Sequence, residues 1–67
     1  MITINQNVKK LVQRIREEFE DMPGVRFTVA EASRFWGLDE PTCGEVLAEL
    51  FATGFLALDL DGRYGQR

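Results

Sequence analysis

The sequence has 67 residues, a hydrophobic fraction of 45% and a formal net charge of −3. This length predicts one small domain, residues 1–67, and the hydrophobic fraction is that of a globular chain. The negative charge argues against non-specific nucleic-acid binding as a main activity. The sequence shows no charged-then-apolar leader and no run of about eighteen apolar residues, so we expect a cytoplasmic protein with no membrane contact.

The residue inventory argues against catalysis. The sequence contains no histidine, its one cysteine is Cys43, and no glycine-rich phosphate loop precedes a predicted helix. A lone thiol without a histidine to activate it is expected to be a buried small hydrophobe. We therefore expect no enzyme activity, no metal and no cofactor.

The first predicted helix is indicated by a single apolar stripe and ends at Pro23-Gly24. Asn5 or Asn7 is expected to cap it, after a polar lead-in over residues 1–7. The stripe has helical spacing and consists of Val8, Leu11, Val12, Ile15, Phe19 and Met22. Residues 25–27 are then predicted to form a brief strand.

Residues 28–54 predict two helices joined by a tight turn. Thr28 and Glu31 form a Thr-x-x-Glu capping box at the start of the first of them. Its apolar face has small residues in the middle, which allow a second helix to approach. That face consists of Val29, Ala32, Ser33 and Trp36.

The turn itself is predicted at Gly37, which supplies the left-handed residue that ends the helix, while Leu38 returns to the core. Asp39 is expected to cap the second helix, and Pro41 is tolerated in its first turn. This helix is expected to stop at Gly54. Its predicted buried residues are Cys43, Val46, Leu47 and Leu50.

A hairpin is predicted after the helix pair. Residues 55–60 are rich in strand formers, and Asp61-Gly62 is typical of a type I′ turn. Arg63-Tyr64 would begin the returning strand, and residues 25–27 would add a third. Tyr64 is expected to cover the edge of the core.

The segment Glu31-Ala32-Ser33-x-x-Trp36-Gly37-Leu38, followed by Cys43, Leu47, Leu50 and Gly54-Phe55-Leu56, resembles the helix-turn-helix of small bacterial winged-helix proteins. Those proteins usually carry E-L-A-x-x-L-G-L, an aliphatic residue, L-x-x-L and G-L at the same spacings. The resemblance covers nearly the whole chain. It implies a mainly α fold with a small β-sheet: three helices plus a short wing of two to three strands. It also implies a DNA-binding, transcription-regulator-like module.

In that family the second helix of the pair enters the major groove. By register, the base-side residues here would be Thr42, Gly44, Glu45 and Glu49, and the phosphate-side residues would be Arg34, Arg63 and Arg67. However, the helix carries Asp39, Glu40, Glu45 and Glu49 and no Lys or Arg, which repels a phosphate backbone. A second function therefore stays open, in which the acidic face docks on a basic protein partner and DNA is not bound.

The first helix has a basic first half and an acidic second half, the reverse of what the helix dipole prefers. This is either a plain solvated face or a self-association surface, on which two antiparallel copies would pair opposite charges. The residues of the predicted homodimer surface are Lys10, Arg14, Glu17, Glu18 and Asp21.

Two aromatic residues near the end of the first helix of the pair have separate expectations. Trp36 occupies a position that the family fills with Leu, so it is expected to anchor the core. Phe35 lies beside the stripe and is either half exposed on a partner surface or folded onto the first helix, which we favour.

Overall fold

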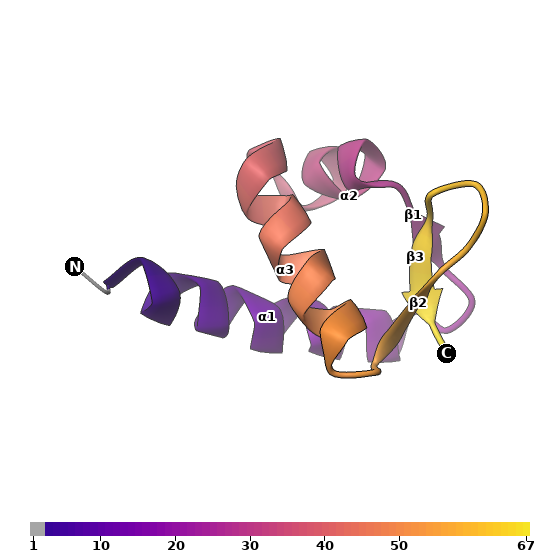
Figure 1. Ribbon diagram of the computed structural model, residues 1–67, viewed down its shortest axis with the longest axis horizontal. Coiled ribbons are helices and arrows are strands. Elements are labelled where there is room, and N and C mark those ends of the chain that lie inside the picture. The colour runs from indigo at the N-terminus through magenta and orange to yellow at the C-terminus, as the bar shows by residue number, and fades with distance from the viewer. Residues whose placement is uncertain (1–2) are drawn as a thin grey trace.

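The computed structural model describes residues 3–67, and their side chains from Val8 onward, as three helices and a three-stranded antiparallel sheet (Figure 1). This is the winged-helix arrangement that the sequence predicts, mainly helical with a small sheet. In Figure 1, α3 crosses α1, α2 lies beside the start of α3, and the sheet stands at the opposite end of α1 from the N-terminus. The elements are α1 (Thr3–Asp21), β1 (Arg26–Phe27), α2 (Val29–Trp36), α3 (Glu40–Ala52), β2 (Leu56–Leu58) and β3 (Tyr64–Gln66).

The start of α1 differs from the prediction. The helix begins at Thr3, so Asn5 and Asn7 lie inside it and neither is the capping residue. The expected polar lead-in is therefore wrong from Thr3 onward, and Met1 and Ile2 lie outside the described residues. Asparagine is only mildly unfavourable in a helix, and such a small cost does not stop propagation of a long helix toward its N-terminus.

The two helices of the pair begin and end where their capping residues predict. The Thr28 hydroxyl accepts from the Glu31 amide at 3.1 Å, and the Glu31 carboxylate accepts from the Thr28 amide at 2.9 Å. Gly37 ends α2 in the left-handed conformation, with φ of 68°, and the Asp39 carboxylate accepts from the Thr42 amide at the start of α3. The capping box, the glycine turn and the Asp39 cap are confirmed.

The hairpin forms at the predicted place, but the predicted turn type is wrong. A type I′ turn needs positive φ at both central residues, and only Gly62, at 80°, has it. Asp59 and Arg63 close a longer loop, with the Asp59 amide donating to the Arg63 carbonyl at 3.0 Å. The Asp59 carboxylate accepts from the amides of Asp61 and Arg63, which stabilises this loop over the two-residue turn.

The strand order in the sheet is β1-β3-β2, so the C-terminal strand lies in the middle. Leu58 and Phe27 lie opposite Tyr64 on its two sides, and all three side chains share the face that turns toward the core. On the other face, Gly65 lies between Arg26 and Ala57. The Arg26 side chain lies directly over this glycine, which is buried.

The core is formed where α1, α3 and the sheet meet. Phe19 of α1 is fully buried, and its ring packs on Trp36 at 5.5 Å and on Phe27 at 6.3 Å between centroids. The predicted buried side of α3 is confirmed. The buried apolar residues are Ile15, Phe19, Ala32, Cys43, Val46, Leu47, Leu50 and Leu56.

Replacing Gly65 with alanine is expected to destabilise the fold by about 1–3 kcal/mol, because overpacking strains a close-packed site. A Cβ here would lie 2.7 Å from Cγ of Arg26 and 3.1 Å from the carbonyl oxygen of Val25. Urea denaturation of the single variant and of Gly65→Ala in an Arg26→Ala background measures this cost. The cost should fall in the double variant, and an equal cost in both backgrounds would contradict the assigned clash.

Candidate functional site

The helix that would read DNA in a winged-helix regulator is α3, and its outward side is divided in two. Because side chains turn by about 100° per residue, Glu45 and Glu49 lie on one flank and Phe51 on the other. Between them runs a line of small residues, Gly44, Ala48 and Ala52. The two carboxylates and the two alanines are exposed.

The acidic flank of α3 has no neutralising partner within the part of the chain that the structure describes. Glu45 and Glu49 form no ion pair there, and α3 carries no Lys or Arg. At the helix start, both the amide and the hydroxyl of Thr42 donate to Asp39, at 3.1 and 3.0 Å. These bonds, from the amide first and then the hydroxyl, lower the pKa of Asp39 below its usual value, so it stays charged. The Thr42 hydroxyl predicted to face bases is thus engaged in the cap.

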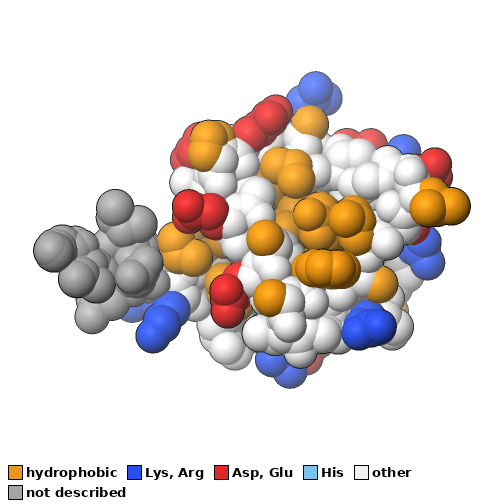
Figure 2. Space-filling view, viewed as in Figure 1, with side chains coloured by type: hydrophobic (Ala, Val, Ile, Leu, Met, Phe, Trp, Pro, Cys, Tyr) orange, Lys and Arg blue, Asp and Glu red, His pale blue; other side chains and the backbone are white. Residues whose placement is uncertain are grey.

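The other flank of α3 joins the hairpin in an apolar surface, here called the α3–hairpin patch, which consists of the exposed Phe51 and Leu58 and the half-buried Tyr64. The Phe51 ring meets the Tyr64 ring edge-on with centroids 6.4 Å apart, and Leu58 pairs with Tyr64 across the two strands. Phe51 is 49% exposed and Leu58 is 45% exposed. Apolar side chains gather at the centre of the face seen in Figure 2, which is the face crossed by α3. Sequence reasoning did not identify this patch.

Gly44 has no packing role that excludes a larger residue. A Cβ at Gly44 would meet only Cγ1 of Val29, at 3.9 Å, which is an ordinary contact. Its backbone is not in the positive-φ region that requires glycine. Glycine inside a helix is unfavourable by roughly 0.8–1.0 kcal/mol relative to alanine. The fold therefore tolerates this residue and does not depend on it.

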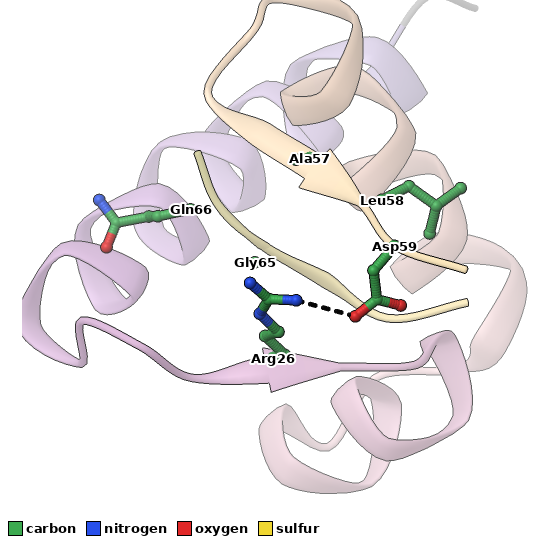
Figure 3. Close-up of a pocket in the computed structure, with 6 residues that line it drawn as sticks. All are labelled: Arg26, Ala57, Leu58, Asp59, Gly65 and Gln66. Carbon is green, nitrogen blue, oxygen red and sulfur yellow. Dashed lines mark hydrogen bonds and ion pairs between the residues drawn. The ribbon is translucent and has the colours of Figure 1, made fainter. Parts of the chain in front are cut away.

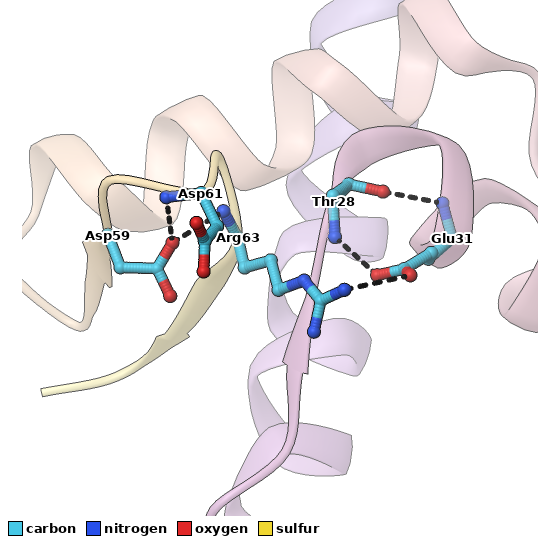
Figure 4. A network of polar contacts seen from close by, with 5 residues as sticks. All are labelled: Thr28, Glu31, Asp59, Asp61 and Arg63. Atoms are coloured by element: carbon cyan, nitrogen blue, oxygen red, sulfur yellow. Dashed lines mark hydrogen bonds and ion pairs between the residues drawn. The ribbon is translucent and has the colours of Figure 1, made fainter.

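The cations predicted for the phosphate side lie on three different elements. Arg34 is exposed on α2, on the side opposite Ala32. Arg67 follows β3, and its guanidinium lies close to Gly54, with Nη1 3.8 Å from where a Cβ on that glycine would be. Arg63, in the hairpin, pairs with the capping-box carboxylate of Glu31 at 3.6 Å (Figure 4). The structure therefore does not bring these cations together on α3, and one of them is already paired.

The predicted self-association residues lie on α1. Lys10, Arg14, Glu17 and Asp21 are exposed and follow helical spacing, so they share one side of the helix. Glu18 differs, because its carboxylate accepts from Nε1 of Trp36 at 2.6 Å and pairs with Arg14 at 3.5 Å. Self-association through this surface stays a prediction, and Glu18 already has two partners within the chain.

The aromatic residues at the end of α2 correct one expectation. Trp36 packs against the core, as predicted, and its hydrogen bond to Glu18 adds a polar contact to α1. Phe35 does not fold out of solvent onto α1. It is 54% exposed, and its ring packs on Phe27 and Trp36 at centroid distances of 5.2 and 5.3 Å. Its place beside the stripe brings the ring against Phe27 of β1, which explains the difference.

Within the described residues there is no group of three or more potential metal ligands. Cys43 is buried, and burial, followed by the nearby carboxylates of Glu40 and Asp39, raises the pKa of its thiol. A depression of about 180 Å³ lies on the outer face of the sheet (Figure 3), smaller than the roughly 300 Å³ at which ligand pockets begin. Across it Nη1 of Arg26 donates to Asp59 at 3.0 Å, so its charged groups satisfy each other.

Comparison with models of protein families, with curated proteins and with solved structures found no match to this chain. Among residues 3–67, no helix is both long enough and apolar enough to cross a membrane.

Gly44→Ala is expected to stabilise the fold by about 0.5–1 kcal/mol, because alanine is the better helix former and the added methyl group fits beside Val29. Urea denaturation monitored by circular dichroism measures the change. Ala48→Gly, one turn later on the same exposed side, is the matched control and should destabilise by a similar amount. A loss of stability in Gly44→Ala would show that the space beside Val29 is not available.

Stability is expected to fall as the pH drops below about 4, in part through Asp59. The Arg63 amide first, and then Arg26 and the Asp61 amide, lower the pKa of Asp59. A carboxylate with a lowered folded-state pKa stabilises the fold above its unfolded value, about 3.9, and this contribution is lost as pH falls through the folded value. Asp59→Asn should therefore flatten the decline of the thermal midpoint between about pH 5 and pH 2.

The control for this experiment is Asp61→Asn. It removes one carboxylate from the same loop but leaves the acceptor of the two loop amides in place. If the thermal midpoint of Asp59→Asn falls with pH as steeply as that of Asp61→Asn, the role given to Asp59 is contradicted.

Proposed function

We propose that this protein is a winged-helix module for protein–protein interaction, with α3 and the hairpin as its binding face. The observation that carries the proposal is the composition of that face. Phe51 and Leu58 of the α3–hairpin patch are exposed beside the half-buried Tyr64. The neighbouring α3 flank carries Glu45 and Glu49, which form no ion pair within the described residues. A patch of large apolar side chains beside charged residues is typical of protein interfaces.

The charges of the same face weigh against DNA. Most of the affinity of a DNA-binding protein comes from cations that displace counterions from phosphates. The helix that would lie in the groove has none, and Arg63 is paired with Glu31 at 3.6 Å. DNA binding and transcription regulation, which the family resemblance implies, stay predictions, as does the cytoplasmic location.

Titration of the isotope-labelled protein with a mixed-sequence duplex, followed by amide NMR shifts at about 50 mM salt, is the direct test. We expect no shifts on α3 or the hairpin at hundreds of micromolar duplex, a range in which non-specific DNA binders respond. Shifts confined to α3 and the hairpin that shrink as salt is added would refute the proposal in favour of DNA.

A gain-of-binding variant shows that this assay can detect a contact. Glu45→Lys with Glu49→Lys replaces two exposed carboxylates by cations without changing the buried side of α3. This variant should bind the duplex, with a salt slope of about −0.9 for each phosphate contacted.

A further inference from the structure

We infer that the partner presents a basic amphipathic helix, which lies along the outward side of α3. This inference rests on the proposed function and specifies the chemistry of the partner. Its apolar side chains would cover Gly44, Ala48 and the α3–hairpin patch. Its Lys or Arg residues would face Glu45 and Glu49.

The shape of the surface favours a helix. Gly44, Ala48 and Ala52 follow one another at intervals of four residues, so they form a row of small residues along α3. A facing helix can approach α3 closely along this row. Gly44 has no side chain, and a Cβ at this position would lie 3.9 Å from Cγ1 of Val29, so there is room for atoms of a partner beside Val29. Phe51 lies on one side of these small residues and packs edge-on against Tyr64, so the hairpin lies next to this side of α3. An amphipathic helix in an apolar groove is a recurrent mode of recognition.

The charges specify the sign of the partner. Glu45 and Glu49 are one helical turn apart on the side of the line away from Phe51, and both are exposed. Asp39 and Glu40 add two carboxylates at the start of the same helix, and α3 carries no compensating cation. A partner helix with Lys or Arg along the edge that faces Glu45 and Glu49 meets favourable potential there.

Two other occupants fit this face less well. A second copy that presents its own α3 would bring Glu45 and Glu49 against the same carboxylates, which is repulsive. An extended segment could instead pair with β2, which is an edge strand of the sheet. That contact would leave Gly44, Glu45 and Glu49 unused.

The test uses three synthetic helices of about 18 residues, a length that supports helix formation. One has a Leu stripe flanked by Lys, the second has the same stripe flanked by Glu, and the third has the composition of the first in an order without a stripe. Of the three peptides, we expect only the Leu/Lys helix to bind. Its binding should shift the amide NMR signals of the protein along α3 and at Phe51, Leu58 and Tyr64. Equal binding of the Leu/Glu helix, no binding of the Leu/Lys helix, or shifts confined to β2 would overturn the inference.

Variants of the protein separate the two flanks. Phe51→Ala should weaken Leu/Lys binding about tenfold, as removal of an interface aromatic residue does. Glu45→Gln with Glu49→Gln should weaken it about fivefold at low salt and much less at about 0.5 M salt. Leu60→Ser is the matched control, because Leu60 is fully exposed at the hairpin tip outside the patch, and should leave binding unchanged. Equal loss with Leu60→Ser would show that peptide binding is non-specific and would overturn the inference.

The outcomes distinguish this inference from the proposed function. Salt-sensitive shifts of α3 with the duplex refute the protein-interaction proposal. A silent duplex together with failure of the Leu/Lys helix refutes only the basic amphipathic partner. Sedimentation of the protein alone at the same concentration tests whether a second copy covers this face. A dimer that Phe51→Ala abolishes would replace the basic partner by a second copy, whereas a dimer that persists in Phe51→Ala does not use the α3–hairpin patch.

Discussion

The short connection between α2 and α3 determines where most of the other elements lie. Only Gly37 and Leu38 separate the end of α2 from the Asp39 cap, and the amides of both donate to the Ser33 carbonyl. With the connection this tight, the crossing of the two helices is set by the left-handed Gly37 and by the small buried Ala32 and Ser33 between them. The resulting α3 packs against α1, α2 and β2, so its outward side is fixed by the same turn.

The parts of the fold predicted from sequence are those that depend on neighbours a few residues apart. The Thr28–Glu31 box, the Gly37 turn and the buried stripe of α3 each need only local spacing, and each is confirmed. Asp61-Gly62 correctly predicted the position of the hairpin, but the predicted type I′ turn was wrong. The Asp59 carboxylate, two residues before Asp61, accepts from the amides of Asp61 and Arg63 and stabilises a longer loop. A side chain that competes for backbone amides leaves no periodic signal in a sequence.

The candidate site depends on contacts between distant segments, and for that reason the sequence indicated only half of it. The carboxylates of α3 can be identified from the sequence, because counting charged residues in a predicted helix requires no knowledge of the tertiary structure. The contact between Phe51 and Tyr64 requires knowing that β3 lies in the middle of the sheet, between β1 and β2. Likewise, the pairing of Arg63 with Glu31 joins the hairpin to the α2 cap and places a carboxylate beside a cation that the sequence alone shows as isolated.

The energetics of the two candidate surfaces differ in kind. The α1 side that carries Lys10, Arg14, Glu17 and Asp21 is opposite the core and has no apolar side chain among these charges. Exposed ion pairs contribute about 0.2–1 kcal/mol each, so a few of them supply much less than the roughly 8 kcal/mol of a micromolar complex. Full burial of one aromatic or leucine side chain contributes about 1.5–3 kcal/mol. The exposed halves of Phe51 and Leu58 together would add about 1.5–3 kcal/mol on burial, a contribution that salt does not screen as it screens the α1 charges. Glu45 and Glu49 then select the sign of the partner.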